Sequence, residues 1–261
     1  MTLIDFLNAN NGQIGMPERK DGLWADHLKV IAITLMFVDH FAVVFLEPGT
    51  VSRMLLRFFG RIVAPIICFL VAEGFFRSSN PRKYITRLLI FAVISHYPFV
   101  LVMGYEFFQA TSVMWSLAMG LLALMVLKDP KIYPVARLLV LIACCAVSYT
   151  ANWNFVAVLW IVSFGLFRGN FKGQIAAFCV VGLICHLLPS FLRFTFSSGP
   201  IPLYQLGIFL AIPILATYNG RIRNRSGTRA RFFYAFYPAH LLLLHLIDRF
   251  SPLARALEFL P

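Results

Sequence analysis

Long apolar runs separated by short polar loops make up almost the whole chain, and they restrict what it can fold into. The nine runs cover approximately residues 27–46, 54–76, 84–103, 111–127, 132–148, 152–168, 172–190, 200–218 and 232–250. A helix needs about 20 apolar residues to cross the hydrocarbon core of a bilayer, and several runs approach that length. Charged residues are only 13% of the chain, too few for a water-soluble surface. The sequence therefore predicts an all-α integral membrane protein, a polytopic helical bundle of about nine transmembrane helices.

Basic residues gather in every second loop of this arrangement. They are Arg77, Arg82, Lys83 and Arg87 after the second run, Lys128, Lys131 and Arg137 after the fourth, Arg168 and Lys172 after the sixth, and Arg221, Arg223, Arg225, Arg229 and Arg231 after the eighth. Cytoplasmic loops of membrane proteins carry this excess of Lys and Arg. The pattern predicts a cytoplasmic N-terminus and an external C-terminus. It divides the chain into a polar cytoplasmic segment (1–26), a transmembrane domain (27–250) and a short tail (251–261).

The net charge of +12 does not indicate nucleic-acid binding, because the cations lie in short loops and no soluble module carries them. The five cysteines all lie inside apolar runs, and no CxxC pair is present. We expect them to be buried apolar residues rather than members of disulfides or zinc sites. No metal site is therefore expected.

Ionisable residues inside the apolar runs are the strongest functional candidates, because a charge at the bilayer centre costs at least about 2.5 kcal/mol. Asp39 and His40 lie about 18 Å along their helix from the start of the first run, in the outer half of the bilayer. Arg57 and Arg61 are four residues apart and share a helix face. We expect Arg61 to pair with Asp39 or to stabilise a developing negative charge. Pro65 is expected to bend this helix.

Two further runs add polar residues to the candidate set. Glu73 stands four residues before Arg77, a spacing that favours an ion pair on one helix face. In the last run Tyr234, Tyr237 and His240 recur every three residues and form a polar stripe. We therefore expect two histidines, one carboxylate and one arginine to surround a single buried cavity.

Each of these residues also has a purely structural explanation. Asp39 and His40 could join helices as a polar pair, and Arg57 could snorkel to the membrane boundary. Tyrosines are in any case enriched at membrane interfaces. His96 and His186 stand alone in their runs, and we expect them to make helix contacts.

Motifs at both ends of the chain resemble those of the TraX family, whose best-known member is the N-acetylase of conjugative pilin. The match comprises LKVIA over 28–32, LMFVDH over 35–40, Gly60-Arg61, Ala64-Pro65, Phe69–Gly74 and FYAFYPAHL over 233–241. Order and spacing agree across roughly residues 28–250. The middle departs from the family, because members often show Asp followed by Tyr-Gly where this chain reads Ala151-Asn152-Trp153-Asn154.

The resemblance implies an integral membrane acyltransferase of the bacterial cytoplasmic (inner) membrane. Such an enzyme transfers an acetyl group from acetyl-CoA to the N-terminal amine of a pilin subunit. The expected site residues are His40 as general base, Asp39 holding or polarising its ring, His240 as the rival base, and Arg61, Tyr237 and Glu73 as substrate-binding groups. The expected partners are acetyl-CoA, a pilin or other surface acceptor, and the lipid bilayer. Because acetyl-CoA is cytoplasmic and the polar cluster lies in the outer half, a tunnel must bring the thioester across.

Other acceptors and other functions remain open. The acyl acceptor could be a surface glycan or a lipid headgroup, which the sequence does not distinguish. Intramembrane Asp and His residues also form proton relays in transporters, although no internal repeat supports that function. A non-enzymatic assembly subunit of a surface appendage is a further alternative, in which the polar residues only hold helices together.

Overall fold

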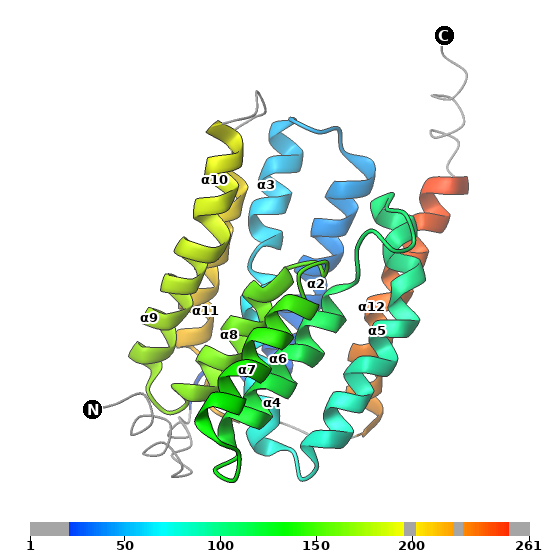
Figure 1. The fold of residues 1–261 in the computed structure, drawn as a ribbon. Helices are drawn as coiled ribbons and strands as arrows, with labels where there is room; N and C mark the ends of the chain where they lie inside the picture. The colour runs from blue at the N-terminus through cyan, green and yellow to red at the C-terminus, as the bar shows by residue number, and fades with distance from the viewer. Residues whose placement is uncertain (1–20, 196–201, 222–226, 251–261) are drawn as a thin grey trace.

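The computed structural model describes residues 21–195, 202–221 and 227–250, and short loops connect the helices within these ranges (Figure 1). Each expected apolar run coincides with a helical segment. No strand forms within the described ranges, where isolated backbone bridges join Leu23 to Tyr218 and Thr111 to Ala151. The all-α prediction is therefore confirmed. The expected tail 251–261 and residues 1–20 of the expected N-terminal segment lie outside the described residues.

The helices follow the chain with short connections. They are α2 (Ala25–Phe45), α3 (Val51–Gly60), α4 (Val63–Arg77), α5 (Pro81–Met103), α6 (Val113–Lys128), α7 (Pro134–Val147), α8 (Asn154–Leu166), α9 (Phe171–Val181), the π segment η1 (Gly182–Leu187), α10 (Leu188–Thr195), the 3-10 segment η2 (Leu203–Leu210), α11 (Ala211–Ala216) and α12 (Gly227–Phe250). Three expected single spans are therefore composite, because each contains more than one helical segment: α3 with α4, α9 with η1 and α10, and η2 with α11.

Helix length separates full membrane spans from shorter helices. Within the described ranges, four stretches are long and apolar enough to cross a bilayer: Ala25–Phe45, Val51–Arg77, Pro81–Met103 and Phe171–Leu192. The helices α6, α7 and α8 have 16, 14 and 13 residues, so they are about 20–24 Å long. A hydrocarbon core is about 30 Å thick. The chain thus has the apolar helices of a membrane protein, and four of them within the described ranges meet both length and composition for a full span, so the expected count of nine is not confirmed.

Local sequence signals explain where helices begin and end. Pro81 opens α5, and the Asn80 side chain caps that helix by accepting a hydrogen bond from the Lys83 backbone N–H at 3.0 Å. Gly104 ends α5 in the left-handed conformation at φ 67°. The Asn170 side chain likewise caps α9 by accepting from the Gly173 backbone at 3.0 Å. These caps satisfy backbone groups that the helices leave unpaired at their ends.

The break between α3 and α4 has a clear cause in Pro65. Proline lacks a backbone N–H, and its ring clashes with the carbonyl of the residue four positions earlier, which is Arg61. α3 accordingly ends at Gly60, Arg61 forms its C-cap, and α4 begins at Val63. The expected bend is therefore a short irregularity at Arg61 and Ile62, within a stretch that continues from Val51 to Arg77. It places Arg61 at a helix end in the interior of the bundle, where the side chain is only 8% exposed.

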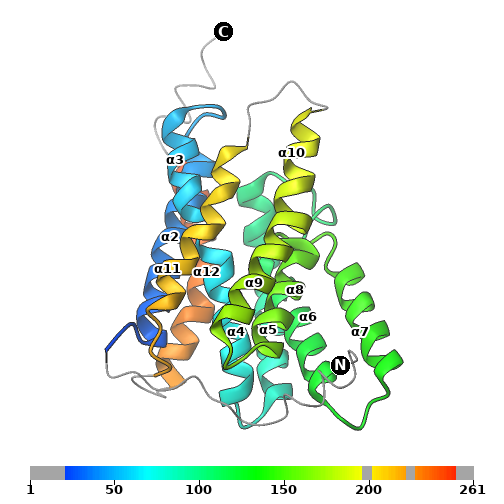
Figure 2. The ribbon, with the colours of Figure 1, turned by 90° about the vertical axis from the view of Figure 1, so that its left-hand side faces the viewer.

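The short helices α6 and α8 pack on each other at the centre of the bundle, in contact with α4, α5, α7 and α9. α12 packs against α2 and α5, which places the last helix beside the first. Figure 2 shows α7 at one edge and α2, α11 and α12 toward the other. The loops 77–81, 128–134 and 166–171 lie at the same end of the bundle (Figure 1). The sequence-based topology assigned these three basic loops to one side of the membrane.

Candidate functional site

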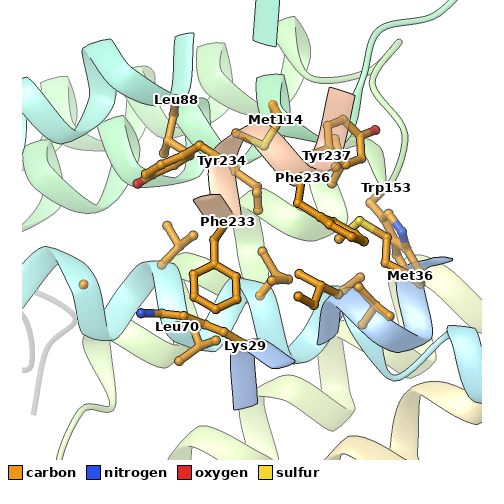
Figure 3. Close-up of a pocket in the computed structure, with 18 of the residues that line it drawn as sticks. Lys29, Met36, Leu70, Leu88, Met114, Trp153, Phe233, Tyr234, Phe236 and Tyr237 are labelled. Atoms are coloured by element: carbon orange, nitrogen blue, oxygen red, sulfur yellow. The ribbon is translucent and has the colours of Figure 1, made fainter. Parts of the chain in front are cut away.

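A cavity of about 260 Å³ lies between α2, α4, α5, α6 and α12. Its α2 wall includes Asp39 and, beside it, residues three or four apart that share one helix face: Ala25, Lys29, Ile33, Met36 and His40. From Ala25 to His40 the helix rises about 22 Å, so the cavity is elongated along α2. Figure 3 shows Lys29 and Tyr234 toward one end and Met36 and Trp153 toward the other. The cavity therefore connects the end of the bundle that carries the basic loops with its interior.

His40 and His240 form a directly bonded pair at the interior end. Nδ1 of His40 lies 2.7 Å from Nε2 of His240, and both side chains are buried. Nδ1 of His240 lies 2.8 Å from the backbone carbonyl oxygen of Phe236, one turn earlier in α12. His40 lines the cavity, whereas His240 lies behind it. The expected convergence of two histidines is therefore present in the structure, across 200 residues of sequence.

The hydrogen bonds assign a tautomer to each ring. A carbonyl oxygen only accepts, so Nδ1 of His240 carries the hydrogen and donates it to Phe236. In the neutral ring, Nε2 of His240 then accepts, and Nδ1 of His40 is the donor between the rings. Nε2 of His40 is left with a lone pair, and no described residue hydrogen-bonds to it. On the cavity wall, an imidazole nitrogen in this state can take a proton from a ligand.

Asp39 pairs with Arg57, which corrects the expectation that its partner is Arg61 or His40. Oδ1 of Asp39 lies 3.5 Å from Nε of Arg57, which is within ion-pair distance but outside hydrogen-bond geometry. Gly60 packs against Asp39, and a Cβ at this glycine would lie 2.6 Å from Oδ1. Adjacent helix residues point about 100° apart, so Asp39 faces α3 while its neighbour His40 faces α12. Asp39 therefore acts on His40 only through its charge.

Arg61 is a buried cation without an anionic partner in the described residues. Its guanidinium lies 5.3 Å from the ring centroid of Trp153 and 5.0 Å from that of Tyr204. Nε of Arg61 is buried and makes no hydrogen bond. Aromatic faces attract a guanidinium but leave its N–H donors free. Because Arg61 lines the same cavity as His40, its Nε–H is available to an anion or a carbonyl oxygen bound there.

Trp153 is a site residue that sequence reasoning missed. It has φ 70° and is followed by Asn154 at φ 34°, a left-handed conformation that is a genuine outlier for so bulky a side chain. The Trp153 ring stacks on His186 at 4.8 Å, and Nε2 of His186 lies 2.9 Å from Oε1 of Gln205. His186 is thus a satisfied helix contact, as expected. The asparagines around Trp153 were the available signal, because Asn tolerates positive φ better than most residues.

Glu73 lies at the basic end of the cavity, away from the histidine pair, and binds two arginines there. Its carboxylate accepts hydrogen bonds from Arg77 at 3.1 Å and from Arg168 at 2.9 Å. The same Arg77 guanidinium donates to the Gly220 carbonyl at 2.6 Å and to the Tyr218 hydroxyl at 3.1 Å. The expected Glu73–Arg77 pair is therefore present, and Arg168 from the α8–α9 connection is an addition. The cluster joins α4 to two loops, so Glu73 is held by protein cations rather than open to a substrate.

Tyr234 and Tyr237 both line the cavity, from different places on α12. Tyr234 stacks on Phe91 at 5.3 Å and belongs to the basic end. Tyr237 is buried next to His40, with ring centroids 6.4 Å apart, and its hydroxyl makes no hydrogen bond to the described residues. The predicted stripe is therefore confirmed as geometry. Tyr237 contributes its ring to the wall beside the histidine pair.

Comparison with known proteins adds to this geometry. The family model described as TraX protein matches residues 25–248, a range that includes every residue lining the cavity. The probable fimbrial assembly protein FimC, serogroup H1, of Dichelobacter nodosus is 33% identical over 232 residues. The match covers 84% of this chain and 93% of that relative. No solved structure matches the chain.

Proposed function

The chain belongs to the TraX family, and from this membership we propose that it is an integral membrane acyltransferase. The proposed reaction moves the acetyl group of acetyl-CoA to the N-terminal amine of a pilin subunit. The observation that carries the proposal is the unpartnered Nε2 of His40, a residue that lines an elongated cavity. A positioned imidazole of this kind is the usual general base in such chemistry.

The reaction places a modest demand on this base. An α-amino group has a pKa of about 7.7–8.0, so part of it is already neutral at working pH. The amine nitrogen attacks the thioester carbonyl carbon, and Nε2 of His40 takes the proton released from nitrogen as the new C–N bond forms. The C–S bond then breaks, and the departing CoA thiolate takes that proton from His40. The products are the acetylated amine and free CoA, so the histidine pair ends as it began.

Arg61 is suited to the negative charge that develops on the thioester oxygen. Its buried Nε has no hydrogen-bond partner, and the guanidinium lies over the rings of Trp153 and Tyr204. A donor fixed before the reaction stabilises an oxyanion without reorganisation, and such donors typically contribute about 3–4 kcal/mol to the transition state. In this mechanism His40 transfers the proton, and Arg61 stabilises the negative charge on the thioester oxygen.

The shape of the cavity supports acetyl-CoA as the donor. The walls between its two ends are largely apolar, with Ile33, Met36, Ile67 and Leu70 among them. An apolar passage of about 22 Å accommodates an extended thioester arm and excludes water that would hydrolyse it. With the basic loops in the cytoplasm, the donor enters from the side on which it is made. The thioester then reaches the histidine pair in the interior.

The acceptor is inferred from the relative. Its printed name makes FimC of Dichelobacter nodosus a probable fimbrial assembly protein, and pilin subunits are the material of such an assembly. The same name also favours a second candidate function, an assembly subunit without catalysis. In that case the Glu73 cluster and the histidine pair only hold helices together.

Intact mass of pilin separates the two functions. A strain that lacks this gene would be complemented with the wild-type protein, with His40→Gln, or with the matched control His96→Gln. His96 bonds to the Phe107 carbonyl on the outer side of α5, away from the cavity. We expect one acetyl group on pilin with wild type and with His96→Gln, and none with His40→Gln. Assembled but unacetylated pilin in every strain would support the assembly subunit instead.

A further inference from the structure

We propose that the basic end of the cavity is a subsite for a phosphate-bearing head group, held by Lys29, Arg77 and Arg87. In the proposed function, on which this inference rests, that head belongs to the acyl donor. The three cations come from α2, α4 and α5. Lys29 and Arg77 line the cavity, and Arg87 lies over the rings of Tyr84 and Tyr234, which line it. We refer to Lys29, Arg77, Arg87, Tyr84 and Tyr218 as the basic mouth.

Distances place these cations around the same aromatic wall. Nζ of Lys29 lies 5.3 Å from the ring centroid of Phe233. The Arg87 guanidinium lies 5.6 Å from the ring of Tyr84 and 5.8 Å from that of Tyr234. Both tyrosines and Phe233 line the cavity, as Lys29 and Arg77 do. Figure 3 shows Lys29, Phe233 and Tyr234 together at this end.

Positive charges outnumber negative charges at the basic mouth. Glu73 is one carboxylate shared between the two guanidiniums of Arg77 and Arg168. Lys29 pairs with Asp26 at 3.2 Å, while no carboxylate among the described residues lies within ion-pair distance of Arg87. Lys29, Arg77, Arg87 and Arg168 therefore share two carboxylates, those of Asp26 and Glu73. An excess of this kind next to an apolar passage attracts a ligand with an anionic head and an apolar arm.

One tyrosine hydroxyl adds a donor to the cations, and a second tyrosine adds its ring to the wall. The Tyr218 hydroxyl accepts from Arg77 at 3.1 Å, so its own hydrogen can be donated to a ligand. Burial raises the pKa of Tyr218 to about 12, and the hydroxyl therefore keeps its proton at neutral pH. Gly74 makes room for Tyr84, because a Cβ at this glycine would lie 2.9 Å from the Tyr84 ring. Charged and neutral donors together suit phosphate oxygens.

Ligand binding tests this subsite without any acyl transfer. We would measure the affinity of CoA, and of pantetheine, which lacks the phosphates, for the full-length protein in nanodiscs of zwitterionic lipid. The variants are Lys29→Gln, Arg87→Gln and their double. Arg82→Gln is the matched control, since it removes an exposed cation from the same helix five residues away. Salt dependence of CoA affinity is measured in parallel.

We expect each mouth variant to weaken CoA binding by roughly tenfold and to leave pantetheine binding unchanged, with no effect of Arg82→Gln. Pantetheine binding also reports that the variants are folded. Unchanged CoA affinity in the double variant, or no CoA binding by the wild type, would overturn the subsite. Nanodiscs with anionic lipid address the other source of phosphate. If Lys29 and Arg87 govern binding of that lipid and not of CoA, the head group belongs to the bilayer and the donor subsite is wrong.

Different results would overturn the proposed acyltransferase function and the proposed phosphate subsite. A protein that binds CoA through the basic mouth but transfers no acetyl group retains the subsite and loses the proposed activity. A protein that transfers acetyl groups with unchanged CoA affinity in the double variant retains the activity and loses the subsite.

Discussion

His40 and His240 share a hydrogen bond of 2.7 Å whose direction is set by the Phe236 carbonyl on the far side of His240. The direction matters because an imidazole is useful as a base only through the nitrogen that lacks a hydrogen. Here that nitrogen is Nε2 of His40, on the cavity wall. In this pair His40 is the base, and His240 is the positioning residue that orients its ring.

The positioning role predicts how substitutions of His240 differ. In His240→Leu no acceptor remains for Nδ1 of His40, and we expect kcat for acetyl transfer to fall by roughly 100-fold, because general-base assistance is worth about that much or more. His240→Gln offers an amide oxygen to the same donor and should retain much of the activity. Steady-state kinetics with acetyl-CoA would measure both, and KM should change little. A higher KM at constant kcat would assign His240 to substrate binding.

Acetyl transfer should require both the positive charge and the planar guanidinium of Arg61. Lysine keeps the charge of Arg61 but not the planar group that lies over the rings of Trp153 and Tyr204. We expect both Arg61→Lys and Arg61→Met to reduce kcat by roughly 100-fold, at normal protein level in the membrane. An active Arg61→Lys beside an inactive Arg61→Met would mean that a point charge suffices. Full activity in both would remove Arg61 from the mechanism.

Gly60 should not accept a larger side chain. A Cβ there would lie 2.6 Å from Oδ1 of Asp39, so Gly60→Ala must displace the carboxylate that faces Arg57. We expect a loss of roughly 1–3 kcal/mol in stability, visible as a lower melting temperature in detergent, together with reduced acetyl transfer. An unchanged melting temperature would show that α2 and α3 can separate at this point without cost.

Glu73 is predicted to be structural rather than a substrate-binding group. Glu73→Ala leaves Arg77 and Arg168 without their shared carboxylate, and we expect a loss of about 3 kcal/mol. The low end of the range for a broken buried pair applies, since both arginines are partly exposed. Glu106→Gln is the control: this carboxylate is exposed, and its loss should stay within about 0.5 kcal/mol. Wild-type stability of Glu73→Ala with impaired acetyl-CoA binding would restore the binding role.

Topology can be tested independently of chemistry. Reporter fusions at Asn80, Lys131 and Asn170 should report the cytoplasm, because these loops carry the basic residues. A fusion at Glu106, at the opposite end of α5, and one at the C-terminus should report the outside. A cytoplasmic C-terminus would mean that one of the short helices fails to complete a crossing.

Much of the fold was predictable because each apolar run forms a helical segment. The expected number of spans is not confirmed, since α6, α7 and α8 are apolar but short. Apolar composition reports burial, and a helix buried against protein looks the same as one exposed to lipid. The length of the helix then determines whether it can cross the bilayer.

The candidate residues were predictable, whereas their partners were not. Placing an ionisable residue inside the bilayer costs free energy, and this cost alone identifies Asp39, His40, Arg61 and His240 as candidates. Which of them touch depends on helix rotation and packing, so Arg57 and not Arg61 faces Asp39. Arg168 reaches Glu73 from a loop 95 residues away, and spacing within a helix carries no information on such a contact.

Acetyl transfer by the purified protein tests the central claim most directly. The protein in detergent, without any membrane gradient, is incubated with acetyl-CoA and a peptide that carries the N-terminus of pilin, and the peptide mass is measured over time. The account predicts acetylation by wild type and by His96→Gln, with a rate lower by roughly 100-fold or more in His40→Gln. Equal rates in wild type and His40→Gln, or no acetylation by wild type, would contradict it.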